Sequence, residues 1–150
     1  MKSKIRLTGL ALCLLAVCVP AAATLGEDAA SVQADQTQMQ GTLQITSAGK
    51  FSVHEIQLPS ATAVKQYVSP AGIVFAVSWK GPSLPDLRQL LGRYFEQYAE
   101  SARTQGAGAG PRASQQPGLV VQSGGHMRAF FGRAYVPQML PRGVLAEEIQ

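Results

Sequence analysis

The stretch SPAGIVFAVSWKGPSLPDLRQLLGRYFEQY, residues 69–98, decides the fold of this chain. It opens with Ser69–Gly72, where proline at the second position has the fixed φ that a tight turn needs. The next eight residues, 73–80, are nearly apolar on both alternating faces, which predicts a buried central strand. One face of that strand is expected to carry Ile73, Phe75, Val77 and Trp79. Gly81–Pro82 then ends the strand.

A helix is predicted to begin directly after this break. Ser83 suits the N-cap, Pro85 the first turn, and Asp86 the capping-box position, where it replaces the more usual glutamate. Apolar and aromatic residues follow at helical spacing and form one stripe: Leu84, Leu87, Leu90, Leu91, Tyr94, Phe95 and Tyr98. We expect one amphipathic helix over 84–103, about 30 Å long, lying across the sheet.

The residues before this stretch predict further strands. Alternating apolar residues in 42–58 indicate two strands around Ser47–Lys50, and 63–68 indicates another. Short consecutive strands joined by tight turns favour an antiparallel meander. Residues 27–40 suit either a short N-terminal helix or a disordered leader, because they carry little apolar material.

The residues after the helix predict a loop and a hairpin. Residues 104–117, TQGAGAGPRASQQP, are low in complexity and predict a flexible loop. Residues 119–136 then indicate a hairpin that turns at Gly124–Gly125. The expected fold class is α+β: residues 24–150 form a single domain, in which an antiparallel sheet packs against one long amphipathic helix, with a short N-terminal helix.

The first residues have the three parts of a secretory signal peptide. The positive part contains Lys2, Lys4 and Arg6, and the apolar part is residues 7–19. Ala21–Ala23 then supplies the small residues of a cleavage site. We expect cleavage after Ala23, so that 1–23 is a signal peptide and the mature protein is periplasmic or secreted. An uncleaved anchor is the alternative, although the apolar run is shorter than the roughly 20 residues of a membrane span.

Charge and cysteine content restrict the functions of the mature chain. The whole chain has 13 Lys+Arg and 9 Asp+Glu; three of the basic residues lie in 1–23, which leaves 10 − 9 = +1. This near-neutral charge argues against nucleic acid as a partner. Both cysteines, Cys13 and Cys18, lie in the signal peptide, so the mature chain has no thiol chemistry. Lipidation of Cys18 stays open, although Val17 is large for that cleavage site.

The chain resembles a family of short exported bacterial proteins, the domain of unknown function numbered 2844. The residues that carry the resemblance are Leu25–Gly26, Ser31–Val32, Val53–Ile56, Tyr67–Trp79, Gly81–Pro82 and Pro85–Arg88. The resemblance covers nearly all of the mature chain. It implies export and a fold, but it implies no activity and no catalytic residue.

The usual catalytic and metal-binding patterns are missing from the sequence. His54 and His126 are the two histidines, and His54 and Glu55 are expected on opposite faces of a strand. Ser123 lies three residues before His126, but the intervening glycines are explained by a hairpin turn. We therefore predict no catalytic, cofactor-binding or metal-binding residue.

Two classes of function remain. The first is a non-enzymatic envelope or secreted protein that binds another macromolecule, such as an exported protein, with no membrane segment after signal cleavage. The second is a small-ligand-binding protein or enzyme with a polar pocket on the sheet face, formed by His54, Glu55, Arg128 and His126. Arg128, Phe130 and Arg133 also interleave basic and aromatic residues as single-strand binders do, but the charge balance argues against that role.

Overall fold

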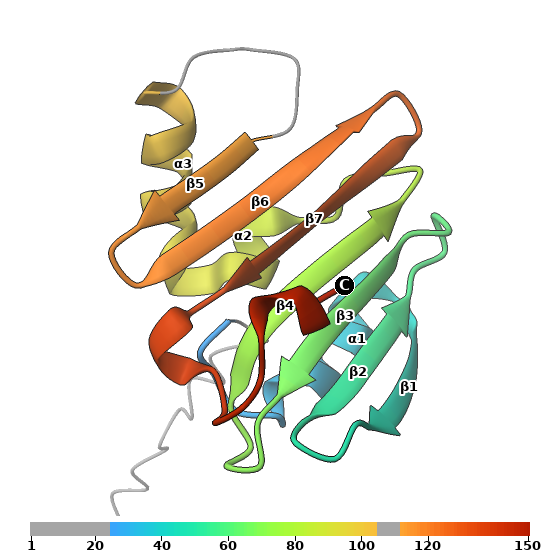
Figure 1. Ribbon diagram of the computed structural model, residues 1–150. Helices are drawn as coiled ribbons and strands as arrows, with labels where there is room; N and C mark the ends of the chain where they lie inside the picture. Colours follow the sequence, from blue (N-terminus) through green and yellow to red (C-terminus); the bar gives the residue numbers. More distant parts are fainter. Residues whose placement is uncertain (1–24, 105–111) are drawn as a thin grey trace, which may run out of the picture.

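The computed structural model describes residues 25–104 and 112–150, so the predicted signal peptide, 1–23, lies outside the described residues. A seven-stranded antiparallel sheet forms the centre of the described part (Figure 1), in the order β1-β2-β3-β4-β7-β6-β5. The α+β class and the antiparallel sheet are thereby confirmed. The strands are β1 (Thr42–Ser47), β2 (Ser52–Gln57), β3 (Ala63–Val68), β4 (Val74–Gly81), β5 (Arg112–Gln116), β6 (Leu119–His126) and β7 (Ala129–Tyr135).

The sheet consists of two meanders that meet at β4 and β7. The chain builds β1 to β4 one beside the next, as predicted. After β4 it passes through the helices to the far edge, and β5, β6 and β7 lead back until β7 pairs with β4. β4 is therefore the middle strand, which confirms its predicted central position.

One detail of β4 differs from the expected alternation of faces. Its pairing with β3 shifts between Tyr67 and Val68. Val77 and Trp79 belong to one hydrophobic cluster, whereas Phe75 packs in another. The extra residue of a β-bulge reverses the side of the sheet to which the following side chains point. The expected common face of Phe75, Val77 and Trp79 is therefore wrong for Phe75.

The predicted continuous helix over 84–103 is broken into three pieces. These are α2 (Leu87–Leu91), the 3₁₀ turn η1 (Gly92–Tyr94) and α3 (Phe95–Thr104). Gly92 has φ 47° and ψ −119°, a positive-φ conformation that favours glycine and interrupts the helix. Asp86 is the N-cap and accepts hydrogen bonds from the backbone nitrogens of Arg88 and Gln89. Ser83, the predicted cap, instead hydrogen-bonds to Thr62.

Two further predictions need correction. The predicted loop over 104–117 is wrong for Arg112–Gln116, which forms β5 at the sheet edge. β5 is held by backbone hydrogen bonds to β6 and needs no apolar side chains. Its polar sequence therefore gave no signal for a strand. The hairpin turns at Met127–Arg128, not at Gly124–Gly125, since His126 pairs with Ala129. Arg128, the second of the two turn residues, has φ 65°, and a positive φ at this position is typical of a type II turn.

Each face of the sheet has its own hydrophobic cluster. On one face, Leu90 and Leu91 of α2 share a cluster with Val64 and Val77, together with Val32 of α1 (Ser31–Met39). α1 forms within the stretch for which a short helix or a leader was predicted. On the other face, Phe51, Tyr67, Phe75 and Ala76 pack against Val144 and Ile149 of the C-terminal segment, which includes the 3₁₀ turns η2 (Pro137–Met139) and η3 (Ala146–Glu148). Figure 1 shows the helices behind the sheet and the C-terminal segment in front.

Candidate functional site

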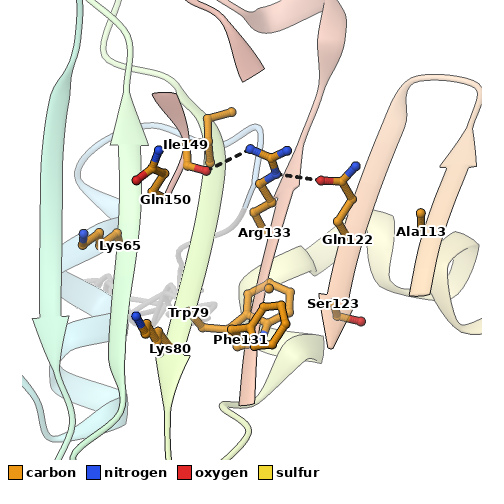
Figure 2. A pocket seen from close by; sticks show the side chains of 11 residues that line it. Lys65, Trp79, Lys80, Ala113, Gln122, Ser123, Phe131, Arg133, Ile149 and Gln150 are labelled. Atoms are coloured by element: carbon orange, nitrogen blue, oxygen red, sulfur yellow. Dashed lines mark hydrogen bonds between the residues drawn. The ribbon is translucent and has the colours of Figure 1, made fainter. Parts of the chain in front are cut away.

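The C-terminal segment leaves part of its sheet face open, and a cavity of about 760 Å³ lies there. This volume is within the usual range for pockets that bind small molecules. The lining residues, which Figure 2 shows from close by, are Lys65, Trp79, Lys80, Ala113, Gln122, Ser123, Phe131, Gly132, Arg133, Ile149 and Gln150. We call this space the basic cavity.

The strand register brings the basic residues of the cavity together. Lys65 pairs with Ser78, which pairs with Arg133, which in turn pairs with Gln122, so these side chains form one row on one face. Lys80 lies two residues after Ser78 on β4, and its partner Phe131 lies two residues before Arg133 on β7. Both side chains are therefore on the same face as this row. Four strands thus contribute to one positively charged surface.

Arg133 connects the cavity to the C-terminal segment. Its Nε donates to Gln122 Oε1 at 2.8 Å, and its Nη1 donates to the backbone oxygens of Ala146 at 2.6 Å and Ile149 at 3.2 Å. Figure 2 shows the guanidinium between Gln122 and Ile149. Among the described residues, Nη2 has no hydrogen-bond partner. Arg133 therefore anchors the segment and keeps the two N–H donors of Nη2 available.

The cavity lining is basic, although Glu55 of β2 pairs directly with Lys65 on the same face of the sheet. Three of its lining side chains are basic, and none of the described lining side chains is acidic. In the described part of the chain the ion pairs are Arg88–Glu96, Arg93–Glu27 and Arg103–Glu100, so no cavity residue takes part in one. Neighbouring cations that outnumber the nearby carboxylates create a local positive potential that attracts anions.

The polar residues predicted for a pocket do not come together. His54 pairs with Gln66 on the face that carries Val77, whereas the adjacent Glu55 lies on the opposite face. His126 and Arg128 are exposed at the tip of the β6–β7 hairpin. Within the described ranges, no group of three His, Cys, Asp or Glu side chains has a metal-binding arrangement.

Comparison with known proteins gives a family but no function. Residues 21–149 match the family described as a protein of unknown function, DUF2844. The chain belongs to this family. The resemblance noted from residues between 25 and 88 is thereby confirmed. Neither the search of curated proteins nor that of solved structures found a match.

A buried polar network on the opposite face of this DUF2844 protein was missed by the sequence analysis. Asp35 of α1 is fully buried and accepts hydrogen bonds from the side-chain amides of Gln66 and Gln89, both at 2.6 Å. The network connects α1, β3 and α2. The sequence indicated this buried aspartate only by its spacing. Asp35 lies between Val32 and Met39 on the apolar side of α1.

His54 lies close to this network in the register. Its Nε2 lies 3.1 Å from Ser52 Oγ, while its Nδ1 is buried without a hydrogen-bond partner among the described residues. Burial lowers the pKa of His54 below its usual value of 6.5, because the charged imidazolium loses solvation.

The basic cavity of the DUF2844 protein was also missed, although part of its signal was visible. Lys65 and Lys80 are charged residues within otherwise apolar strands, which marks a face that is not packed. Arg133 was considered together with Phe130, but the two are three residues apart on β7 and therefore face opposite sides. In the described ranges no helix has the length and apolar character to cross a membrane.

Proposed function

We propose that this DUF2844 protein is an exported, non-enzymatic binding protein of the bacterial envelope, periplasmic or secreted. Its binding surface is the open part of the sheet, which receives a negatively charged group of its ligand or partner. The observation that carries this proposal is the basic cavity, with three basic side chains and no acidic side chain among its described lining residues.

The composition of the cavity supports binding over catalysis. Its charged side chains are lysine and arginine, which bind anions through charge-assisted hydrogen bonds. General acid–base chemistry usually depends on histidine or carboxylate groups with suitable pKa values. The cavity lining within the described residues contains neither type.

The sequence supports the location. Residues 1–23 have the positive, apolar and small-residue parts of a signal peptide in the correct order. The family match begins at residue 21, close to the predicted cleavage after Ala23. An envelope location restricts the partners to exported macromolecules and to small molecules that reach that compartment.

Photo-cross-linking in intact cells tests this proposal. A photo-reactive amino acid replaces Gln122, which lines the cavity, or Gln38, an exposed control on α1. We expect a defined cross-linked product from position 122 alone, and a loss of that product when Lys80→Gln is added. Equal products from both positions, or no effect of Lys80→Gln, would refute binding at the cavity. The mass of the recovered protein tests cleavage after Ala23.

A further inference from the structure

The edge strand β1 has a row of free backbone hydrogen-bonding groups. Figure 1 shows β1 at the right-hand edge of the sheet, with no further strand beside it. In an antiparallel pair, residues that bond to the neighbouring strand alternate with residues whose N–H and C=O point away from it. The backbone nitrogen of Ala48 donates to the oxygen of Phe51 at 2.8 Å, so Ala48 belongs to the bonded set of this hairpin. The backbone groups of Leu43, Ile45 and Ser47 therefore point to the open side of β1.

β1 lacks the features that usually keep an edge strand from pairing. Natural edge strands are commonly protected by charged side chains, proline, a bulge or a very short length. β1 has 6 residues, TLQITS, without a charge or a proline, and its pairing with β2 runs without a register shift. Ile45 is 58% exposed, so its β-branched side chain is available for a cross-strand contact. The other edge strand, β5, carries the charged Arg112. β1 is therefore the edge that is open to another strand.

The outward groups of β1 are complementary to those of a second copy of the chain. A two-fold axis beside Ile45 places two β1 strands antiparallel, with each Ile45 opposite the other and each Leu43 opposite Ser47 of the second copy. Every outward N–H and C=O of these three residues then has a partner, and no like charges face each other. A segment of another protein would need pockets that select its side chains, and the basic cavity includes no residue of β1 or β2. The symmetry of the strand therefore favours a second copy.

We infer that β1 is a homodimer interface, at which two copies of this protein join edge to edge into one continuous antiparallel sheet. The axis of the dimer passes beside Ile45. This inference goes beyond the proposed function and does not depend on it, because the lining residues of both basic cavities lie outside the interface.

Amide hydrogen exchange tests the pairing in the unaltered protein. Between about 10 µM and about 1 mM protein, exchange of the outward amides of Leu43, Ile45 and Ser47 should slow at least about tenfold as the dimer forms. The amides of Gln44 and Thr46 already bond to β2, so their exchange should slow less than about threefold. Unchanged exchange of the outward amides, or equal slowing of both sets, would overturn the inference.

Matched charge variants test the register of the two strands. Ile45→Lys places two lysines directly opposite each other across the axis, where like charges are destabilising. Sedimentation velocity should show that dimerisation weakens at least about tenfold. Gln44→Lys adds the same charge at an exposed neighbour whose counterpart on the second copy is Thr46, so it should weaken dimerisation less than about threefold. Equal effects of the two variants would contradict an axis beside Ile45.

A mixture of Ile45→Lys and Ile45→Glu tests the two-fold symmetry. Opposite charges face each other only in the mixed dimer, so we expect it to form about as tightly as the parent dimer, while each variant alone is weakened at least about tenfold. A mixed dimer can form only from folded chains, and circular dichroism of each variant checks the fold separately. A mixture that dimerises no better than either variant alone would refute the proposed interface.

Discussion

Gly132→Ala is expected to destabilise the protein, because Trp79 occupies the space above this glycine. A Cβ at Gly132 would lie 2.6 Å from Trp79 Cε2 and 2.9 Å from the backbone oxygen of Gln122. Trp79 is 2% exposed and the Gln122 oxygen belongs to a paired strand, so neither atom has room to move. Overpacking of this kind costs roughly 1–3 kcal/mol, and we take about 3 here.

A smaller opposing effect comes from the unfolded state. Alanine has fewer unfolded conformations than glycine, which stabilises the fold by about 0.4–1 kcal/mol where its backbone geometry is compatible. The net loss in the free energy of unfolding is therefore about 2 kcal/mol, and the melting temperature should fall by roughly 8 °C. Gly124→Ala is the matched control, because its Cβ would meet the end of the exposed Phe131 ring, which can move aside.

Urea unfolding measures both variants directly. The chain has one tryptophan, so fluorescence reports on Trp79 itself. We expect Gly124→Ala to stay within about 0.5 kcal/mol of the parent protein. In a Trp79→Phe background, followed by circular dichroism, the cost of Gly132→Ala should shrink by more than about 1 kcal/mol, which is the signature of direct contact. Equal stability of the two glycine variants would refute the reasoning.

Three further predictions concern the buried polar groups. Asp35→Ala should reduce the free energy of unfolding by about 3 kcal/mol, because two buried glutamine amides lose their acceptor. Asp35→Asn should reduce the free energy of unfolding by less, since its amide oxygen still accepts one hydrogen bond. Urea unfolding compares the two variants, and equal losses of stability would contradict this account. Burial lowers the pKa of His54, so the folded protein binds its proton less readily than the unfolded chain, and stability should fall as pH drops below about 6.5. His54→Gln should flatten that slope, measured by urea unfolding at several pH values, and an unchanged slope would exclude His54 as its cause. Tyr67→Phe removes the hydroxyl that bonds to the backbone of Gln150, so it should cost about 1 kcal/mol and speed amide exchange in the C-terminal segment, and unchanged exchange would refute the anchoring role.

The elements that the sequence predicted well are those in which packing imposes a simple period. β1 alternates apolar and polar residues and β4 is nearly apolar on both faces, and the positions of both agree with the structure within about one or two residues. β5 has no such pattern, because an edge strand requires only backbone pairing with β6. The apolar stripe over 84–98 suggested one helix, although Gly92 lies inside it and breaks it.

The basic cavity could not be predicted from the sequence, because it depends on the topology of the sheet. Lys65 and Lys80 lie on consecutive strands, and their common face follows from alternation alone. Arg133 and Phe131 join them because β7 pairs with β4, although β5, β6 and the helices intervene along the chain. No local pattern specifies that pairing, and the C-terminal segment that borders the cavity has no regular period either.

Alternation along β4 and β7 also separates the packed side chains from the charged ones. Trp79 and Gly132 pair with each other, and the indole belongs to the cluster on the helical side. The flanking pair Lys80 and Phe131 faces the basic cavity. Substitutions at the first pair therefore change packing and leave the cavity charges in place, while Lys80→Gln removes a charge that packs against no core residue. Trp79 and Gly132 also line the cavity, so a substitution at either can change its shape, whereas Lys80→Gln tests its charge.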